Sequence, residues 1–209
     1  RKAGVVECTI VVGYMADAIR DYFGASYRGL NLSYVENTAY AETNNLYSFW
    51  MARAELDDDT LLLEADLVFD TQLVSQLVSM DESNVAVVDR YQPSMDGTVI
   101  LASGDFAESM VLKSDQGRWF DYRTALKTVN IYRLSKETLA NVILPEMEAF
   151  LNDGRTGQYY EAVFASLIAS GRMEMAVLNT GNKKWAEIDT LDDLKEAEKM
   201  FASAPAAIG

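Results

Sequence analysis

Acidic side chains follow two apolar runs in this chain, in positions suited to bind a metal ion. Asp66 comes directly after TLLLEA, and Glu187 and Asp189 lie two residues apart at the end of KWAEID. Ligands of open α/β sheets bind outside the carboxyl ends of the strands, and Mg²⁺ prefers oxygen ligands. Residues two apart on a strand point to the same side. We therefore predict that Asp66, Glu187 and Asp189 converge on one magnesium-sized site, in which Asp66 and Asp189 are catalytic.

Helix capping is the alternative role for these carboxylates. Asp66 or Asp70 would equally cap the helix that follows the first run. The segment from Thr190 to Asp193 has the pattern of a capping box that would begin the last helix. The two roles are compatible in the second run, because Asp189 can bind a metal while Thr190 caps the helix.

Two asparagines and a lysine are candidates for substrate contacts. Asn44 and Asn45 stand at the start of a predicted helix, where one carboxamide suffices as a cap and the other can bind a nucleobase edge or a phosphate. Lys127 lies among apolar residues in the predicted strand LKTVNIYR. If Lys127 faces the ligand side of the sheet, it is a point charge that can bind a phosphate, and we predict a catalytic and substrate-binding role for it. The alternative is a solvent-facing lysine on an edge strand.

Aromatic residues accompany a glutamate in the second half of the chain. Trp119, Tyr122, Tyr159 and Tyr160, together with Glu161, could enclose an ammonium group through cation–π and carboxylate contacts. On this basis we predict that Tyr159 and Glu161 bind substrate. The alternative is that the rings belong to the hydrophobic core, since aromatics at helical spacing usually pack there.

The elements that position these side chains alternate between strands and helices. Apolar periodicity predicts strands at 8–12, 30–36, 60–65, 84–90, 98–103, 126–133, 173–178 and 184–188. It predicts helices at 15–23, 44–56, 68–80, 159–170, 191–201 and from 135 past Pro145, with a break or kink before the proline. This order indicates an α/β fold with a mostly parallel sheet, to which the helix-poor stretch 84–133 adds antiparallel strands.

Composition excludes several kinds of chemistry. The 209 residues include 18 Lys and Arg against 32 Asp and Glu, a formal net charge of −14, no His and one cysteine, Cys8. Without His there is no Ser-His-Asp or Cys-His catalysis and no HExxH zinc site. A single cysteine excludes an internal disulfide and a cysteine-rich zinc site. We expect no binding to nucleic acid, because the chain is strongly acidic, and no membrane span. With no visible signal peptide, we expect a cytoplasmic protein.

Five motifs in order resemble those of one family. They are IVVGY before a helix, NNLYSFW, LLLEADLVF, KTVNIYRLSKE and KWAEIDTLDDLKEAE, spread over 4–201. They are similar to motifs of nucleotidyltransferases of the sugar-nucleotide pyrophosphorylase type, and most similar to those of the phosphocholine and phosphonate cytidylyltransferases. The resemblance implies a Rossmann-like sheet with an inserted antiparallel substrate-binding region. It also implies Mg²⁺ as the cofactor, and transfer of CMP from CTP to a small phospho- or phosphono-acid with release of pyrophosphate.

The resemblance implies roles for the candidate residues as well. Asp66 matches the family's strand-end metal aspartate, Glu187 and Asp189 match its C-terminal metal pair, and Asn44 and Asn45 match positions near the substrate and nucleotide. An anionic oxygen of the acceptor would attack, so no protein nucleophile is required. Catalysis would then consist of positioning and of charge neutralisation by Mg²⁺ and a lysine, for which Lys127 is the candidate.

One part of the family pattern has no counterpart in the sequence. It is the opening strand with its Gly-rich loop, whose Arg and Lys hold the triphosphate. We therefore expect one nucleotidyltransferase domain over 1–202 that lacks these elements, and a disordered tail over 203–209. We also expect residues 1–209 on their own to be inactive.

The leading hypothesis is an enzyme that joins CMP to a phosphonate such as 2-aminoethylphosphonate. The alternatives are phosphocholine as the acceptor, a sugar-1-phosphate nucleotidylyltransferase, and a non-catalytic nucleotide-sensing module. The presence of Asp66, Glu187 and Asp189 together argues against the last of these. Fusion to another phosphonate-pathway enzyme and a homodimer are both compatible with the sequence.

Overall fold

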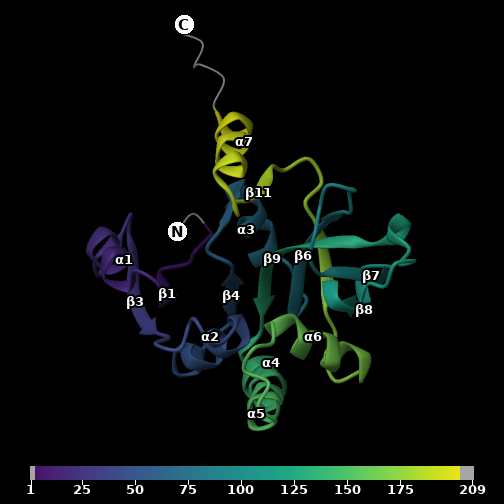
Figure 1. Ribbon diagram of the computed structural model, residues 1–209, viewed down its shortest axis with the longest axis horizontal. Coiled ribbons are helices and arrows are strands. Elements are labelled where there is room, and N and C mark those ends of the chain that lie inside the picture. The colour runs from purple at the N-terminus through teal and green to yellow at the C-terminus, as the bar shows by residue number, and fades with distance from the viewer. Residues whose placement is uncertain (1–2, 203–209) are drawn as a thin grey trace, which may run out of the picture.

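A computed structural model describes residues 3–202, which form a layered α/β fold (Figure 1). Six strands form the main sheet in the order β4-β9-β6-β10-β8-β7, with bounds Thr60–Leu63, Leu126–Leu134, Asn84–Arg90, Ala176–Asn179, Phe106–Val111 and Val99–Ser103. A separate sheet has the order β1-β3-β2, with bounds Glu7–Val12, Leu30–Glu36 and Ser26–Tyr27. A two-stranded ribbon pairs β5 (Leu67–Phe69) with β11 (Trp185–Glu187). The predicted tail, 203–209, lies outside the described residues.

Helices cover both faces of the main sheet. Helix α3 (Thr71–Val78) packs on one face, and α2 (Asn45–Met51), α5 (Leu144–Asn152) and α6 (Tyr160–Ala169) pack on the other. The other helices are α1 (Ala16–Phe23), α4 (Lys136–Thr138) and α7 (Leu191–Phe201), with 3₁₀ turns at Ala52–Glu55, Lys113–Asp115 and Tyr122–Thr124 and a π-helical turn at Leu139–Ile143. None of the helices within residues 3–202 has both the length and the hydrophobicity that crossing a bilayer requires.

The two-residue period of the strands explains this layering. In β6, Val85 and Val87 pack against Leu73 of α3, whereas Ala86 and Val88 pack on the side of α2, α5 and α6. All five side chains are fully buried. Burial of each larger apolar side chain contributes about 1.5–3 kcal/mol to stability, so β6 ties both helical layers to the sheet.

The predicted α/β class is confirmed, but the main sheet is mixed rather than mostly parallel. Within the described residues, β6 and β10 form its one parallel pair, and β9 is antiparallel to β4, β6 and β7. Strands β7, β8 and β9 follow one another without a crossover helix. Strand β7 is antiparallel to both of its neighbours, β8 and β9, so this stretch joins the main sheet by antiparallel pairing without a crossover helix.

Three local predictions also change. The predicted helix over 68–80 begins only at Thr71, because Leu67–Phe69 pairs with β11. Strand β8, Phe106–Val111, was not indicated by the periodicity. The predicted break or kink before Pro145 takes the form of a π-helical turn, Leu139–Ile143, which leads into α5 without interrupting the helical chain path.

Candidate functional site

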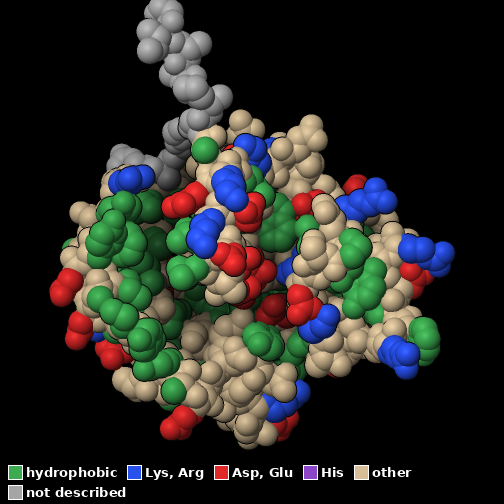
Figure 2. Space-filling model, turned by 45° about the horizontal axis from the view of Figure 1, so that its top comes forward, with side chains coloured by type: hydrophobic (Ala, Val, Ile, Leu, Met, Phe, Trp, Pro, Cys, Tyr) green, Lys and Arg blue, Asp and Glu red, His purple; other side chains and the backbone are tan. Residues whose placement is uncertain are grey.

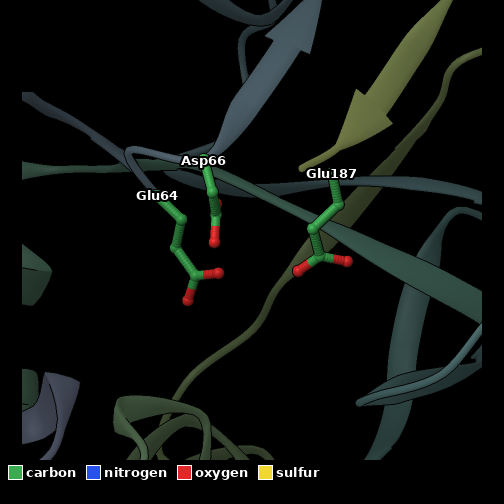
Figure 3. Close-up of side chains that lie close together, drawn as sticks. All are labelled: Glu64, Asp66 and Glu187. Atoms are coloured by element: carbon green, nitrogen blue, oxygen red, sulfur yellow. The ribbon is translucent and has the colours of Figure 1, made fainter. Parts of the chain in front are cut away.

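Three carboxylates converge just beyond the end of β4 (Figure 3). Glu64, Asp66 and Glu187 each contribute an oxygen, and these oxygens all lie within 4.8 Å of one another. Glu64 and Asp66 follow β4, whereas Glu187 ends β11. The amide of Ile188 donates to the carbonyl oxygen of Asp66 at 2.9 Å, so main-chain bonds next to the β5–β11 ribbon hold the two segments together.

The predicted convergence of Asp66 and Glu187 is found, with Glu64 as the third member. Asp189 is not part of this group, and its role as a metal ligand stays a prediction. Burial is the main cause that raises the pKa of Glu187, and the charges of Asp66, Asp189 and Glu64 add to the shift. Glu64 was missed because the periodicity placed it inside the predicted strand 60–65. Its spacing of two residues from Asp66 is the signal that would have identified it.

Three donors hold the Glu64 carboxylate. The Tyr160 hydroxyl and Asn45 Nδ2 donate to Oε1 at 3.0 and 3.1 Å, and Asn130 Nδ2 donates to Oε2 at 2.8 Å. Burial raises the pKa of Glu64, while the hydrogen bonds from Tyr160 and Asn130 oppose that shift. The network therefore fixes the orientation of Glu64 and offsets part of the rise in its pKa.

Lys127 lies at the edge of this acidic cluster, and the alternative of a solvent-facing lysine on an edge strand is wrong. Its side chain is 3% exposed, and β9 has a partner on each side. Nζ donates to the Thr128 carbonyl oxygen at 2.9 Å and lies 3.9 Å from Oε2 of Glu187. Its charge also opposes the raised pKa values of Glu64 and Glu161. One ammonium among several carboxylates leaves a net negative charge, which favours a cation.

The two consecutive asparagines divide their tasks. Asn44 is the N-cap of α2, and its side chain accepts a hydrogen bond from the Asn45 amide at 2.8 Å. Asn45 reaches the cluster, because its Nδ2 donates to Glu64 and its Oδ1 accepts from the Tyr160 amide at 2.9 Å. The prediction that one asparagine caps the helix is confirmed. Contact of either side chain with substrate stays a prediction.

Glu161 is a second buried carboxyl group beside the cluster. It is 5% exposed, and its Oε1 accepts a long hydrogen bond of 3.5 Å from Thr98 Oγ1, whereas its Oε2 has no hydrogen-bond partner within residues 3–202. Burial raises the pKa of Glu161 to about 7, and the charge of Glu64 adds to the shift. The group therefore has an unused acceptor oxygen next to the site.

The predicted aromatic enclosure is not found in the part of the chain that the structure describes. Trp119 is 85% exposed, with the Arg118 guanidinium 5.0 Å from its ring centre. Tyr122 stacks on Tyr91, with ring centres 4.2 Å apart. Tyr160 is buried against Phe49, Tyr132 and Phe164, which is the alternative role in the core. Tyr159 is the N-cap residue of α6 and is 52% exposed.

The cluster fits a divalent cation. All its donors are carboxylate oxygens, the kind of ligand that Mg²⁺ prefers. Oδ1 of Asp66 is buried and has no hydrogen-bond partner in the described part of the chain, so it can bind a cation without losing a bond. Figure 3 shows the three carboxylates pointing into one space, and Figure 2 shows acidic side chains gathered near the centre of one face of the molecule.

Known proteins resemble this chain in sequence and in structure, although no family model matches it. CMP-5'-(3-aminopropyl)phosphonate synthase of Streptomyces rubellomurinus is 33% identical to this chain over 201 residues. These residues are 95% of this chain and 32% of that protein, so the chain spans about a third of the relative's length. CTP:phosphoglutamine cytidylyltransferase of Campylobacter jejuni is 24% identical over 220 residues, 93% of this chain and 82% of that protein. The solved structure of CTP:phosphocholine cytidylyltransferase from Streptococcus pneumoniae shares the fold, with a TM-score of 0.74 at 19% identity over 95% of this chain and 80% of that one.

Proposed function

We propose a catalytic role for this chain, whose resemblance to the nucleotidyltransferases, and among them to the cytidylyltransferases, is confirmed by its relatives. The reaction would join CMP from CTP to a small phosphonate of the 2-aminoethylphosphonate kind and release pyrophosphate. The observation that carries the proposal is the set of three converging carboxylates with Lys127 at its edge. The chain is also 33% identical over nearly its whole length to a protein named for a CMP-phosphonate product.

In this proposal the three carboxylates hold a magnesium ion. Glu64, Asp66 and Glu187 would bind it, and Asp189 is the candidate for a further ligand. When bound, the ion would neutralise charge on the phosphates of the nucleotide. Because the ligands come from β11 and from the segment after β4, the ribbon fixes their separation before any ligand arrives.

The bond changes need no nucleophile from the protein. An anionic oxygen of the acceptor forms a bond to the α-phosphorus of CTP, while the bond from that phosphorus to the bridging oxygen of pyrophosphate breaks. Two anions must approach each other for this step, and their repulsion is costly away from bulk water. Lys127 would lower that cost, because it is a buried cation at the edge of the carboxylate cluster.

The environment of Glu161 favours an acceptor that carries a primary ammonium group. Its unpartnered Oε2 can accept a hydrogen bond from such a group, and we propose that Glu161, with Tyr159 and the asparagines Asn44 and Asn45, lines the substrate site. A quaternary ammonium, as in phosphocholine, cannot donate hydrogen bonds and is usually bound by a cage of aromatic rings. The rings predicted for that cage are separated here, so phosphocholine is the weaker candidate.

The test is pyrophosphate release by the complete protein with CTP and Mg²⁺. The acceptors are 2-aminoethylphosphonate, 3-aminopropylphosphonate, phosphocholine and glucose 1-phosphate, and ³¹P NMR identifies the product. We expect CMP conjugates of the aminoalkylphosphonates, and loss of turnover with EDTA or with Asp66→Asn. Asp70→Asn is the matched control, because Asp70 accepts from the Lys184 amide outside the cluster and asparagine keeps that acceptor. No conjugate with any acceptor, or faster turnover of glucose 1-phosphate, contradicts the proposal.

A further inference from the structure

Asn130 has an unusual backbone conformation in the middle of β9. Its φ is 60°, and it is one of three non-glycine residues with positive φ between residues 3 and 202. The pairing of β9 with β6 shifts register at the same place, since Ala86 lies opposite Tyr132 but Val88 lies opposite Thr128. The strand therefore bulges at Asn130, and bulges next to active sites commonly redirect a side chain.

A local explanation does not account for this conformation. Asparagine often adopts positive φ where its side chain bonds to nearby backbone groups in a turn. Here Oδ1 of Asn130 is buried, in a residue that is 7% exposed, and no residue between 3 and 202 donates a hydrogen bond to it. Among the described residues, the Asn130 side chain forms a hydrogen bond only with Glu64.

Both the side chain and the main chain of Asn130 bind Glu64. Nδ2 donates to Oε2 at 2.8 Å, and the Asn130 carbonyl oxygen accepts from the Glu64 amide at 3.3 Å. Asn45 differs, because it also accepts from the Tyr160 amide and so joins α2 to α6. Of the two asparagines that donate to Glu64, Asn130 is thus the one whose side chain makes no other hydrogen bond within the described residues.

We propose that Asn130 is a positioning residue, which holds the Glu64 carboxylate in the orientation that binds a divalent cation. The inference rests on the proposed function, since it concerns the same metal site. Strained residues persist where the surrounding structure fixes them, and they concentrate at functional sites. Groups that orient metal ligands typically change metal affinity by 10- to 100-fold when they are removed.

The experiment titrates the complete protein with Mn²⁺, without nucleotide, and follows the free ion by EPR. Asn130→Gly removes the amide but suits positive φ, because glycine adopts it without steric cost. We expect the Kd for Mn²⁺ to rise about ten-fold or more, while the Tm without metal stays within a few degrees of wild type or increases. In a Glu64→Gln background, the same substitution should change Kd by less than about two-fold, because Asn130 acts through Glu64.

Arg28→Gly is the matched control. Arg28 also has positive φ, at 48°, but lies exposed between β2 and β3, so its replacement should leave the affinity for Mn²⁺ unchanged. Affinity of Asn130→Gly within about two-fold of wild type, additive effects in the Glu64→Gln background, or a Tm loss above about 10 °C overturns the role of Asn130. Failure of the wild-type protein to bind Mn²⁺ overturns the metal site itself, and with it the proposed function.

Discussion

The buried carboxyl group of Glu161 predicts that the protein without a bound cation loses stability as the pH rises. The pKa of this group is about 7 in the folded protein, mainly because of burial, against an ordinary value of 4.5. The folded state therefore keeps a proton that the unfolded state has already released. The resulting stabilisation is fully present below about pH 4.5 and is lost as the pH rises through 7.

The magnitude follows from the two pKa values. Each pKa unit corresponds to about 1.4 kcal/mol, so this group changes the free energy of unfolding by about 3 kcal/mol across its full range and by about 2.5 kcal/mol between pH 5 and pH 8. The side chain is almost fully buried, so solvent screening reduces this value little. A chain of this size shifts its Tm by about 2–4 °C for each kcal/mol, which gives a change of about 5–10 °C.

The assay compares wild type with Glu161→Gln by urea denaturation from pH 5 to pH 8 in EDTA. Glutamine keeps the size of the side chain and an acceptor for Thr98, but it does not titrate. The variant should become more stable relative to wild type by about 2.5 kcal/mol over this range. Other raised carboxyl groups, such as Glu64 and Glu187, occur in both proteins and largely cancel in the difference. A difference that is constant within about 0.5 kcal/mol, or one that shrinks with rising pH, refutes the reasoning.

Three further predictions concern single residues. Lys127→Ala should lower kcat/KM for the acceptor about ten-fold or more, equal to ~1.4 kcal/mol, with little change in CTP binding. Steady-state kinetics with both substrates varied would measure this loss, and unaltered acceptor kinetics would contradict the prediction. Gly97→Ala should lower the free energy of unfolding in urea by about 1–2 kcal/mol, because Gly97 has φ 101° and a Cβ would lie 3.0 Å from Lys127 Nζ. An unchanged midpoint of urea unfolding would contradict this prediction. Burial raises the pKa of Glu146, but hydrogen bonds from Arg172 and Ser166 outweigh it and leave the pKa lowered. Glu146→Gln should therefore cost about 1 kcal/mol at pH 7 and less as the pH falls below 4.5, and an equal cost at pH 3 would be the contrary result.

The features that the sequence predicted well depend on neighbouring residues. The capping box at the start of α7 is present as predicted, with Thr190 and Asp193 bonding each other's backbone amides. Asn44 caps α2 for the same local reason. The convergence of Asp66 and Glu187 was predicted too, but it depends on the pairing of the distant strands β5 and β11 rather than on neighbouring residues.

The features that were mispredicted depend on which strands become neighbours. For Lys127 the sequence could not exclude the alternative of an edge strand, because only the pairing of β9 on both sides shows that the residue is buried. The antiparallel strands predicted for 84–133 are found, but β9 lies within the main sheet, between β4 and β6, so the sheet is not mostly parallel. The bulge that turns Asn130 toward Glu64 arises from the same pairing and leaves no local signal.

The β5–β11 ribbon makes the acidic cluster a late product of folding. Glu64 and Asp66 are synthesised long before Glu187, and bringing them together closes a long loop, which is slow and entropically costly. A nascent chain on the ribosome, or one truncated before β11, contains only two of the three carboxylates. A cation bound by all three carboxylates would therefore stabilise only molecules in which this last strand has already docked.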